Sequence, residues 1–163
     1  MPGHGVGGAA RDDGQRHAVL HGRAGDLLDR AVAARVDKVA VFTAASETFN
    51  RKNINTSTAG SIRRFRPVVK GAKGAGLTVR GYVSTAFWCA FEGQIAPEAT
   101  VDLAERLVDM GVDEVSISDT IGKATPDEVA RLLGYLQARP LPLGRDDSQG
   151  ADRAGADAEA IRG

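Results

Sequence analysis

The sequence predicts an α/β protein whose parallel sheet is built from consecutive strand–helix units. Residues 35–41 and 111–117 share one pattern of apolar and charged positions, and each copy follows a segment with helical periodicity. A third strand is predicted at 77–84, after a glycine that would end the preceding helix. The three strands begin about 36 to 41 residues apart, a spacing typical of βα units. Such units form either an open doubly wound sheet or a (β/α)8 barrel, and spacing alone does not separate the two.

Three parallel strands are therefore expected near residues 37–43, 78–84 and 113–118. The helices expected between them have local signals of different strength. Residues 97–110 begin with proline, carry an apolar stripe and stop at a glycine. Residues 58–75 contain three glycines and Pro67, so we expect this helix to be kinked or broken at the proline.

The junctions between helices and strands carry a signal of their own. Gly76 and Gly111 stand where a helix ends and a strand follows, and Arg35 occupies the same slot in the first unit. If this slot is left-handed, arginine there costs on the order of 1 kcal/mol relative to glycine. The last helix is expected to start at Thr125, with proline at the first helical position and Glu128 three residues after the cap.

Composition limits the class of protein. Lys plus Arg and Asp plus Glu each number 21 in 163 residues, so no net charge points to nucleic acid or to an anionic membrane. No apolar run approaches the roughly 18 to 20 residues of a transmembrane helix, and the N-terminal stretch lacks the apolar region of a secretory signal. The single cysteine cannot form an intramolecular disulfide, which suits a reducing compartment. We therefore expect a cytoplasmic protein that binds neither nucleic acid nor membrane.

The two ends of the chain differ from its middle. Residues 1–24 are rich in glycine and arginine without periodicity, and 139–163 hold few large apolar side chains where a fourth strand is due. We expect a loose N-terminal segment at 1–24, a partial barrel domain at 25–138 and a loose C-terminal tail at 139–163. The first and third strands would then have open outer edges, and the sheet would expose an apolar inner face. Self-association, or a partner that supplies missing strands, is therefore expected.

Polar side chains gather where the predicted strands end. Asp119 follows the strand at 113–118, in the stretch VSISDTIGKATPDEV. In barrel and doubly wound folds, catalytic side chains gather at this carboxyl end of the strands. The alternative is that Asp119 caps a turn. Ser46, Glu47 and the loop 85–92 also follow predicted strands, so all three loops are expected on one rim.

Three stretches of the chain carry a recognisable pattern. They are AVFTAASETFNRKNINTS at 40–57, VRGYVSTAFWCAFEG at 79–93 and MGVDEVSISDTIGKATP at 110–126. Together they resemble the hydroxymethylglutaryl-CoA lyase family, over residues 25–137. The resemblance implies a partial (β/α)8 TIM barrel with three to four parallel βα units. The DTIG turn alone is shared with related acyl-CoA synthases and aldolases, so a fragment of one of these is the alternative.

The resemblance also implies a function. Members of the family cleave the acyl-CoA substrate 3-hydroxy-3-methylglutaryl-CoA to acetyl-CoA and acetoacetate, in leucine degradation and ketone-body metabolism, with a divalent metal, Mg or Mn. This chemistry needs a base for the hydroxyl proton and stabilisation of the developing enolate charge. By resemblance Asp119 is the catalytic residue, implicated in proton transfer. The positions expected to bind substrate or to support the surrounding loops are Ser116, Arg80, Asn53, Asn55, Glu92 and Cys89.

Three of these positions have a structural alternative. For Arg80, a structural ion pair is favoured over a substrate contact. Cys89 is expected to be small, buried and inert, because the family's catalytic cysteine lies in a later loop. Glu92 is expected to fix a loop rather than to act as a base.

The chain departs from the family at the metal site. The family holds its metal with an aspartate on the first strand, a His-x-His pair and a later asparagine, but no histidine here follows His21, and the catalytic cysteine loop is missing. His17 and His21 are i,i+4, yet a helix through them would have to tolerate two glycines, so no metal ligand is assigned. Trp88 and Ala90 also stand where the family usually has glycine and proline, and Ser118 replaces a glycine.

A complete barrel of this kind takes about 250 residues, so this chain is expected to supply only some of the strands. Three hypotheses stay open: a lyase that is active only with missing segments or a partner chain, an inactive truncated remnant, and an assembly module that kept the fold without the chemistry. For the isolated chain we expect no cleavage of the acyl-CoA with added Mg²⁺ or Mn²⁺.

Overall fold

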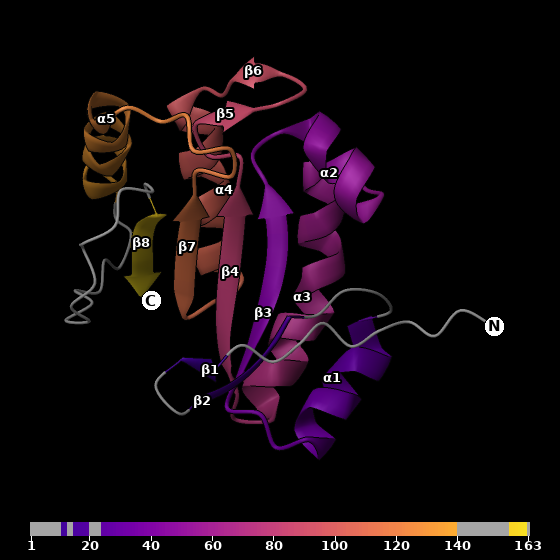
Figure 1. The fold of residues 1–163 in the computed structure, drawn as a ribbon. Helices are drawn as coiled ribbons and strands as arrows, with labels where there is room; N and C mark the ends of the chain where they lie inside the picture. Colours follow the sequence, from indigo (N-terminus) through magenta and orange to yellow (C-terminus); the bar gives the residue numbers. More distant parts are fainter. Residues whose placement is uncertain (1–10, 13–14, 20–23, 140–156, 163) are drawn as a thin grey trace.

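The centre of the protein is a trio of parallel strands. The computed structural model describes residues 11–12, 15–19, 24–139 and 157–162 (Figure 1). The central strands, in spatial order, are β3 (Lys38–Ala44), β4 (Thr78–Ser84) and β7 (Glu114–Ser118). β3 pairs in parallel with β4 along its whole length, and β4 pairs in parallel with β7. The three predicted strands and their parallel pairing are confirmed.

Further strands pair with the outer edges of this trio. β2 (Gln15–Val19) pairs in parallel with β3, and β1 (Arg11–Asp12) pairs antiparallel with β2. β8 (Asp157–Arg162) pairs antiparallel with β7. The expected open edges of β3 and β7 are therefore occupied, by strands whose pairing depends on distant backbone groups rather than on a local apolar pattern. The domain boundaries at 24 and 138 and the self-association stay predictions, since most of both ends lies outside the described residues.

Helices α3 (Thr58–Gly74) and α4 (Pro97–Asp109) cover one face of this sheet (Figure 1). The covered face is aliphatic, and its strand positions are almost completely buried: Val39, Val41, Val79, Val83, Val115 and Ile117. Gly81 lies among them because a Cβ at this position would come 3.0 Å from Cδ1 of Leu107 in α4. Each fully buried valine or leucine contributes about 1.5–3 kcal/mol, so this layer is a principal source of stability.

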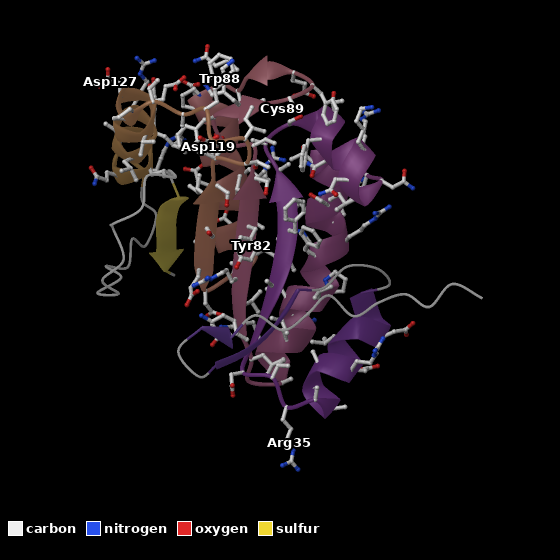
Figure 2. The ribbon with its side chains drawn as sticks, in the orientation of Figure 1. Arg35, Tyr82, Trp88, Cys89, Asp119 and Asp127 are labelled. Carbon is white, nitrogen blue, oxygen red and sulfur yellow. The ribbon has the colours of Figure 1, made fainter. Side chains whose placement is uncertain are left out.

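The opposite face of the sheet is polar and aromatic. The register places Phe42, Tyr82 and Ser116 in one row across the strands, and Arg80 beside Glu114 in the next row. Figure 2 shows Tyr82 midway along β4. The expected apolar inner face is therefore wrong, because alternation along the strands turns the valines of β3 and β7 toward the helices.

The remaining elements complete the strand–helix units. α1 (Ala24–Ala33) packs against α3, α2 (Glu47–Ile54) follows β3, and α5 (Pro126–Gln137) follows β7 and packs against α4. A short hairpin of β5 (Trp88–Cys89) and β6 (Gly93–Gln94) lies between β4 and α4 in the sequence. The expected start of α5 is confirmed, because Thr125 and Glu128 form a reciprocal capping box.

The helix-to-strand junctions are left-handed, so the condition considered for Arg35 is met. Gly76 and Gly111 have φ values of +77° and +98°, and Arg35 adopts +52° in the same slot. The break expected at Pro67 is absent, since α3 continues through it. Buried side chains on the turns that follow, among them Val69, hold this part of α3 against the sheet. Within the described part of the chain, no helix is long and apolar enough to cross a membrane.

Candidate functional site

The loops after β3, β4 and β7 lie together at the carboxyl end of the sheet and form one rim. The backbone N–H of Ala45 donates to the carbonyl of Ser84 at 2.9 Å, which joins the first loop to the second. The N–H of Thr85 donates to Oγ1 of Thr120 at 2.7 Å, which joins the second loop to the third. Thr85 is fully buried and has a φ of +52°, so the junction is held in a fixed, left-handed conformation.

Asp119 lies in the loop directly after β7 (Figure 2). Its Oδ2 atom accepts a hydrogen bond from the N–H of Ala124 at 2.7 Å, so one carboxylate oxygen closes the turn. Its Oδ1 atom is buried and has no hydrogen-bond partner among the described residues. A buried polar atom without a partner costs about 1–3 kcal/mol, and more if it is charged. The turn-capping interpretation thus accounts for one oxygen and leaves the other available to a donor outside these residues.

Cys89 connects the β5–β6 hairpin to the loop after β3. Its side chain is 2% exposed, and Sγ donates a hydrogen bond to Oγ of Ser46 at 3.1 Å. The same Ser46 oxygen accepts from the N–H of Phe49 at 3.0 Å and caps the start of α2. A small, buried thiol with one local hydroxyl partner is typical of a packing role.

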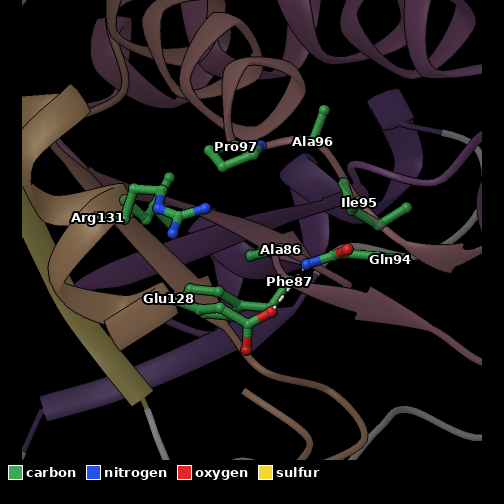
Figure 3. Close-up of a pocket in the computed structure, with 9 residues that line it drawn as sticks. Ala86, Phe87, Gln94, Ile95, Ala96, Pro97, Glu128 and Arg131 are labelled. Atoms are coloured by element: carbon green, nitrogen blue, oxygen red, sulfur yellow. Dashed lines mark hydrogen bonds between the residues drawn. The ribbon is translucent and has the colours of Figure 1, made fainter. Parts of the chain in front are cut away.

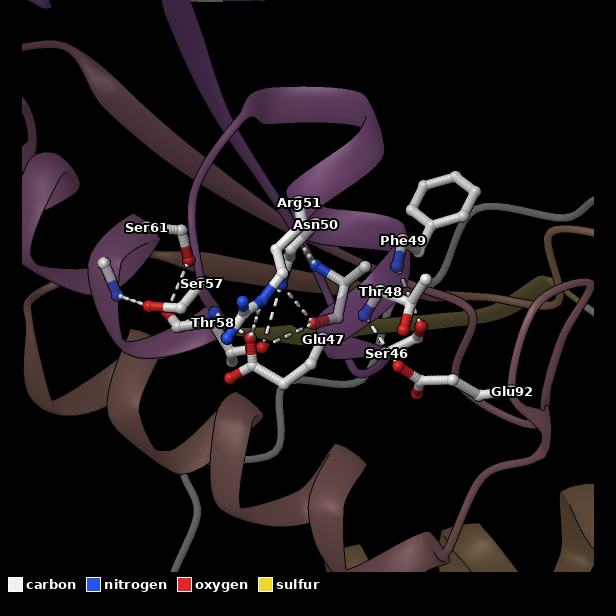
Figure 4. Close-up of polar contacts among 12 residues, drawn as sticks. Ser46, Glu47, Thr48, Phe49, Asn50, Arg51, Ser57, Thr58, Ser61 and Glu92 are labelled. Atoms are coloured by element: carbon white, nitrogen blue, oxygen red, sulfur yellow. Dashed lines mark hydrogen bonds and ion pairs between the residues drawn. The ribbon is translucent and has the colours of Figure 1, made fainter.

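Glu92 connects the hairpin to the start of α2 from the other side (Figure 4). Its Oε1 atom accepts a hydrogen bond from the N–H of Thr48 at 2.6 Å. Partial burial opposes ionisation of the carboxyl, but hydrogen bonds from Thr48 and Ser46 outweigh it and lower the pKa of Glu92 below its ordinary value of 4.5. A negative charge at a helix N-terminus is favourable, so the contact supports the loop that Glu92 was expected to fix.

Asn50 is a polar side chain near the rim whose amide is bonded at both ends, and no motif singles it out (Figure 4). It is fully buried in α2. Its Oδ1 atom accepts from the N–H of Ala44 at 2.9 Å, while Nδ2 donates to the carbonyl of Ala44 at 2.8 Å and to Oγ1 of Thr58 at 2.9 Å. The amide thus pairs with the last residue of β3 as a neighbouring strand would, and it also binds the first residue of α3.

The neighbouring asparagines that the family motif selects are placed differently. Asn53 is exposed on α2, and Asn55 is the exposed C-cap of that helix, with a φ of +50°. The left-handed conformation at the end of a helix favours asparagine. Asn55 is therefore suited to support the loop through its backbone. One signal could have revealed Asn50: asparagine is a poor helix former, and here it stands inside a short helix that follows a strand.

Arg80 lies farther from the rim, on the polar face of the sheet. Its Nε donates to Oε2 of Glu114 at 2.7 Å, and Nζ of Lys38 contacts the two Glu114 oxygens at 2.9 and 3.0 Å. Burial opposes ionisation of Glu114, but Lys38 and Arg80 outweigh it and lower the pKa of Glu114. Burial likewise disfavours the charged form of Arg80, but Tyr82 and Glu114 raise its pKa. The structural ion pair considered for Arg80 is present, and Ser116 lies one row nearer to the rim.

Trp88 joins the hairpin to the loop that carries Asp119. Its Nε1 donates to Oε1 of Glu128 at 3.1 Å, and Nζ of Lys123 lies 3.8 Å from the centroid of its ring. The same Glu128 oxygen accepts from Nε2 of Gln94 at 2.9 Å. Hydrogen bonds, led by the one from the N–H of Thr125, lower the pKa of Glu128 and keep it anionic. We call Trp88, Lys123, Glu128 and Gln94 the tryptophan clamp.

The described residues do not fit the metal site of the resembled family. They contain no group of three or more histidine, cysteine, aspartate or glutamate side chains that could hold a metal ion. His17 is on β2, paired with Lys38, and not on a helix, while His4 and His21 lie outside the described residues. The free oxygen of Asp119 is a single ligand, whereas magnesium and manganese take about six.

Comparison with known proteins places this rim in a family. A family model described as HMGL-like matches residues 6–142. The hydroxymethylglutaryl-CoA lyase of Pseudomonas mevalonii is 48% identical over 116 residues, which are 71% of this chain and 38% of the relative. The cytoplasmic 3-hydroxy-3-methylglutaryl-CoA lyase of Danio rerio is 52% identical over 103 residues, which are 63% of this chain and 31% of the relative. The chain therefore spans less than half the length of these two relatives.

Comparison with solved structures indicates the same family. The HMG-CoA lyase of Brucella melitensis superposes with a TM-score of 0.73 at 41% identity, over 80% of this chain and 46% of that chain. An HMG-CoA lyase of Acinetobacter baumannii, in complex with coenzyme A and 3-methylmalate, gives a TM-score of 0.70 at 27% identity. This match covers 82% of this chain and 43% of that chain. The partial (β/α)8 barrel expected from the sequence is confirmed. The chain belongs to the HMGL-like family.

Proposed function

We propose that this chain contributes part of a hydroxymethylglutaryl-CoA lyase active site, with Asp119 as its acid–base group. The observation that carries the proposal is the buried Oδ1 of Asp119, which has no partner among the described residues and lies at the rim where barrel enzymes act. The relatives named as lyases and the neighbour that binds coenzyme A support an acyl-CoA substrate. A cytoplasmic location is part of the proposal.

The proposed reaction needs one base and one acid. Oδ1 of Asp119 takes the proton of the 3-hydroxyl group of the substrate. The hydroxyl oxygen becomes the ketone oxygen of acetoacetate as the C2–C3 bond breaks. The electron pair of that bond passes to C2 and its thioester as the enolate of acetyl-CoA, and protonation at C2 completes the products. The hydrogen bond from Ala124 fixes the other oxygen of Asp119, and the tryptophan clamp holds the loop, so the carboxylate is positioned before the substrate arrives.

The other sequence-selected residues have supporting roles in this proposal. Ser116 faces the same side of the sheet as Tyr82 and is proposed to contact substrate. Asn53 is exposed at the rim helix and is proposed to bind the acyl-CoA, while Asn55, Glu92 and Cys89 support the loops through the contacts described above.

The divalent metal of the family, Mg or Mn, would polarise the substrate oxygens when bound. The described residues do not supply its ligands, so no step is derived through it. The proposal therefore places turnover in an assembly in which the remaining barrel strands, from another segment or a partner chain, complete the site. For the isolated chain we expect no measurable cleavage of 3-hydroxy-3-methylglutaryl-CoA with added Mg²⁺ or Mn²⁺.

A chimera tests the proposal directly. Residues 25–138 would replace the matching segment of the Pseudomonas mevalonii lyase, with which the chain shares 48% identity. We expect cleavage activity in the chimera, and we expect Asp119→Asn to lower kcat at least about a hundredfold, because general acid–base groups contribute roughly 10²–10⁴. The matched control is Asp127→Asn, which removes an exposed carboxylate at the start of α5.

Two results would contradict the proposal. One is a folded chimera that binds coenzyme A but shows no cleavage. The other is an Asp119→Asn chimera that retains the activity of the Asp127→Asn control, since the buried oxygen would then have no part in proton transfer. Circular dichroism of each variant separates loss of chemistry from loss of fold.

A further inference from the structure

A cavity of about 330 Å³ lies between the β5–β6 hairpin, the start of α4 and the start of α5 (Figure 3). Its apolar wall consists of buried side chains that are at most 8% exposed: Ala86, Phe87, Ile95 and Leu132. Asp119 and the residues proposed to bind substrate do not line it. Its volume is within the range of about 300–1,000 Å³ that small-molecule sites occupy. The cavity is therefore separate from the proposed lyase site.

Arg131, an exposed residue of α5, supplies the positive charge of this cavity, and Glu128 supplies a negative one. Figure 3 shows its side chain pointing from α5 into the space that the lining residues enclose. The guanidinium has no hydrogen bond or ion pair with any residue in the described part of the chain. Such a group presents a rigid fork of donors that suits a carboxylate.

The nearest carboxylate of the same helix does not neutralise Arg131. Glu128 stands one turn earlier in α5, but its oxygens accept from Trp88 and Gln94 on one side and from Thr125 on the other. Its oxygens are therefore occupied by neutral donors of the tryptophan clamp and of its own capping box, so it makes no ion pair with Arg131, although its negative charge remains at the wall of the cavity. The unpaired guanidinium and the apolar wall together define what the cavity can hold.

We propose that this cavity binds a small organic carboxylate with an apolar body. The carboxylate would pair with Arg131, and the body would lie on Phe87 and Leu132. The first turn of α4 adds a favourable field for an anion, because Pro97 lines the cavity and the N-cap, Ala96, provides no side-chain hydrogen bond. A carboxylate that reaches Arg131 gains a charged pair of hydrogen bonds that an uncharged ligand of the same shape does not gain, so we expect the acid to bind more tightly than its amide.

The tryptophan clamp makes occupancy of the cavity observable. Gln94 lines the cavity and shares the Oε1 atom of Glu128 with the indole of Trp88. A ligand that contacts Gln94 changes the surroundings of this indole. Trp88 is the only tryptophan of the chain, so intrinsic fluorescence reports on this place alone.

The test is a titration of the full chain with benzoate, using benzamide as the uncharged probe of the same shape. We expect a saturable change in Trp88 fluorescence and in calorimetric heat with benzoate, and binding of benzamide at least about tenfold weaker. Arg131→Gln should weaken benzoate binding at least about tenfold, whereas Arg131→Lys, which keeps the charge but not the fork of donors, should restore part of it. Arg63→Gln, on the exposed surface of α3, is the matched control and should bind as the unchanged chain does.

Three outcomes would overturn the proposal. Benzoate binding that Arg131→Gln leaves unchanged would remove Arg131 from the site. Equal binding of benzamide would show that charge is not selected. The absence of both heat and fluorescence change up to about 10 mM benzoate would show no usable affinity for this class of ligand. Circular dichroism of the Arg131 variants confirms that they are folded before binding is compared.

Discussion

Asn50 and Asp119 both lie just beyond the carboxyl ends of parallel strands, yet the hydrogen bonding of their polar atoms differs. Both ends of the Asn50 amide are bonded, to the last residue of β3 and the first residue of α3. Asp119 uses one oxygen to close its own turn and leaves the other buried without a partner among the described residues. A fully satisfied side chain maintains the fold, whereas a side chain with unused bonding capacity is suited to act on something else.

The largest effect on stability is expected at Asn50. Asn50→Ala would leave the N–H of Ala44 without a partner, leave its carbonyl only the 3.5 Å contact from Oγ1 of Thr58, and open a cavity at a fully buried site, so we expect a loss of about 4 kcal/mol in the free energy of unfolding. Urea denaturation followed by circular dichroism measures the change.

The same measurement on two other variants sharpens the comparison. Asn53→Ala changes an exposed asparagine of the same helix, and its stability should stay within about 0.5 kcal/mol or rise slightly. Asp119→Asn retains an oxygen for the N–H of Ala124, so its loss should also be small beside that of Asn50→Ala. Equal losses at all three positions would show that the contrast between Asn50 and Asp119 has no energetic meaning.

A somewhat smaller effect is expected at the ion cluster on the polar face. Glu114→Gln removes the carboxylate that contacts both Lys38 and Arg80 and leaves two partly buried cations side by side. Removal of one partner from a buried pair costs about 3 kcal/mol. Thermal or urea unfolding at neutral pH measures it, with the exposed Glu98→Gln as the control that should change little.

The cost of Glu114→Gln should also depend on pH. The pKa of Glu114 in the folded protein lies below its ordinary value of 4.5. Its ionised form therefore stabilises the protein above pH 4.5, and this contribution is lost as the pH falls through the lowered pKa. The difference between the unchanged chain and Glu114→Gln should narrow in acid. A difference that is constant from pH 7 to pH 3 would contradict the ionic origin of the effect.

The smallest effect is expected at Glu92, which is exposed. Glu92→Gln removes a negative charge from the N-terminus of α2 but keeps an acceptor for the N–H of Thr48, so we expect a loss of about 0.3–1 kcal/mol. Asp109→Asn removes a negative charge from the C-terminal end of α4 and should stabilise slightly. Stability changes of the same sign in the two variants, measured by urea denaturation, would show that helix charge does not govern them.

Much of the fold can be predicted from the sequence, because its signals are local. The strand at 37–43 is observed at Lys38–Ala44, and the capping residues of α5 are within three positions of one another. The left-handed slot occupied by Arg35 follows from its alignment with two glycines. In each case the residues that form the signal are neighbours in the chain.

The rest could not be predicted, because it depends on contacts between distant residues. The pairing of β2 with β3 and of β8 with β7 joins segments without a strong apolar pattern. The continuity of α3 through Pro67 depends on packing against the sheet, which overrides propensity. At the candidate site, Asp119 is found from its place after a strand, but its two unlike oxygens become visible only when the turn to Ala124 is seen.

The crossover connections of the parallel sheet have a consequence for how the protein is made. Lys38 pairs with Thr78, and Arg80 pairs with Glu114, so the partners are 40 and 34 positions apart along the chain. No two strands of the trio can meet as a local hairpin, and closing such long loops before any contact forms makes folding slow. During synthesis β4 emerges before β7, and its outer edge is exposed until the ribosome has added more than thirty further residues. The interval between these two strands is therefore the stage at which a chaperone, or a second nascent copy, would have the longest access to the edge of β4.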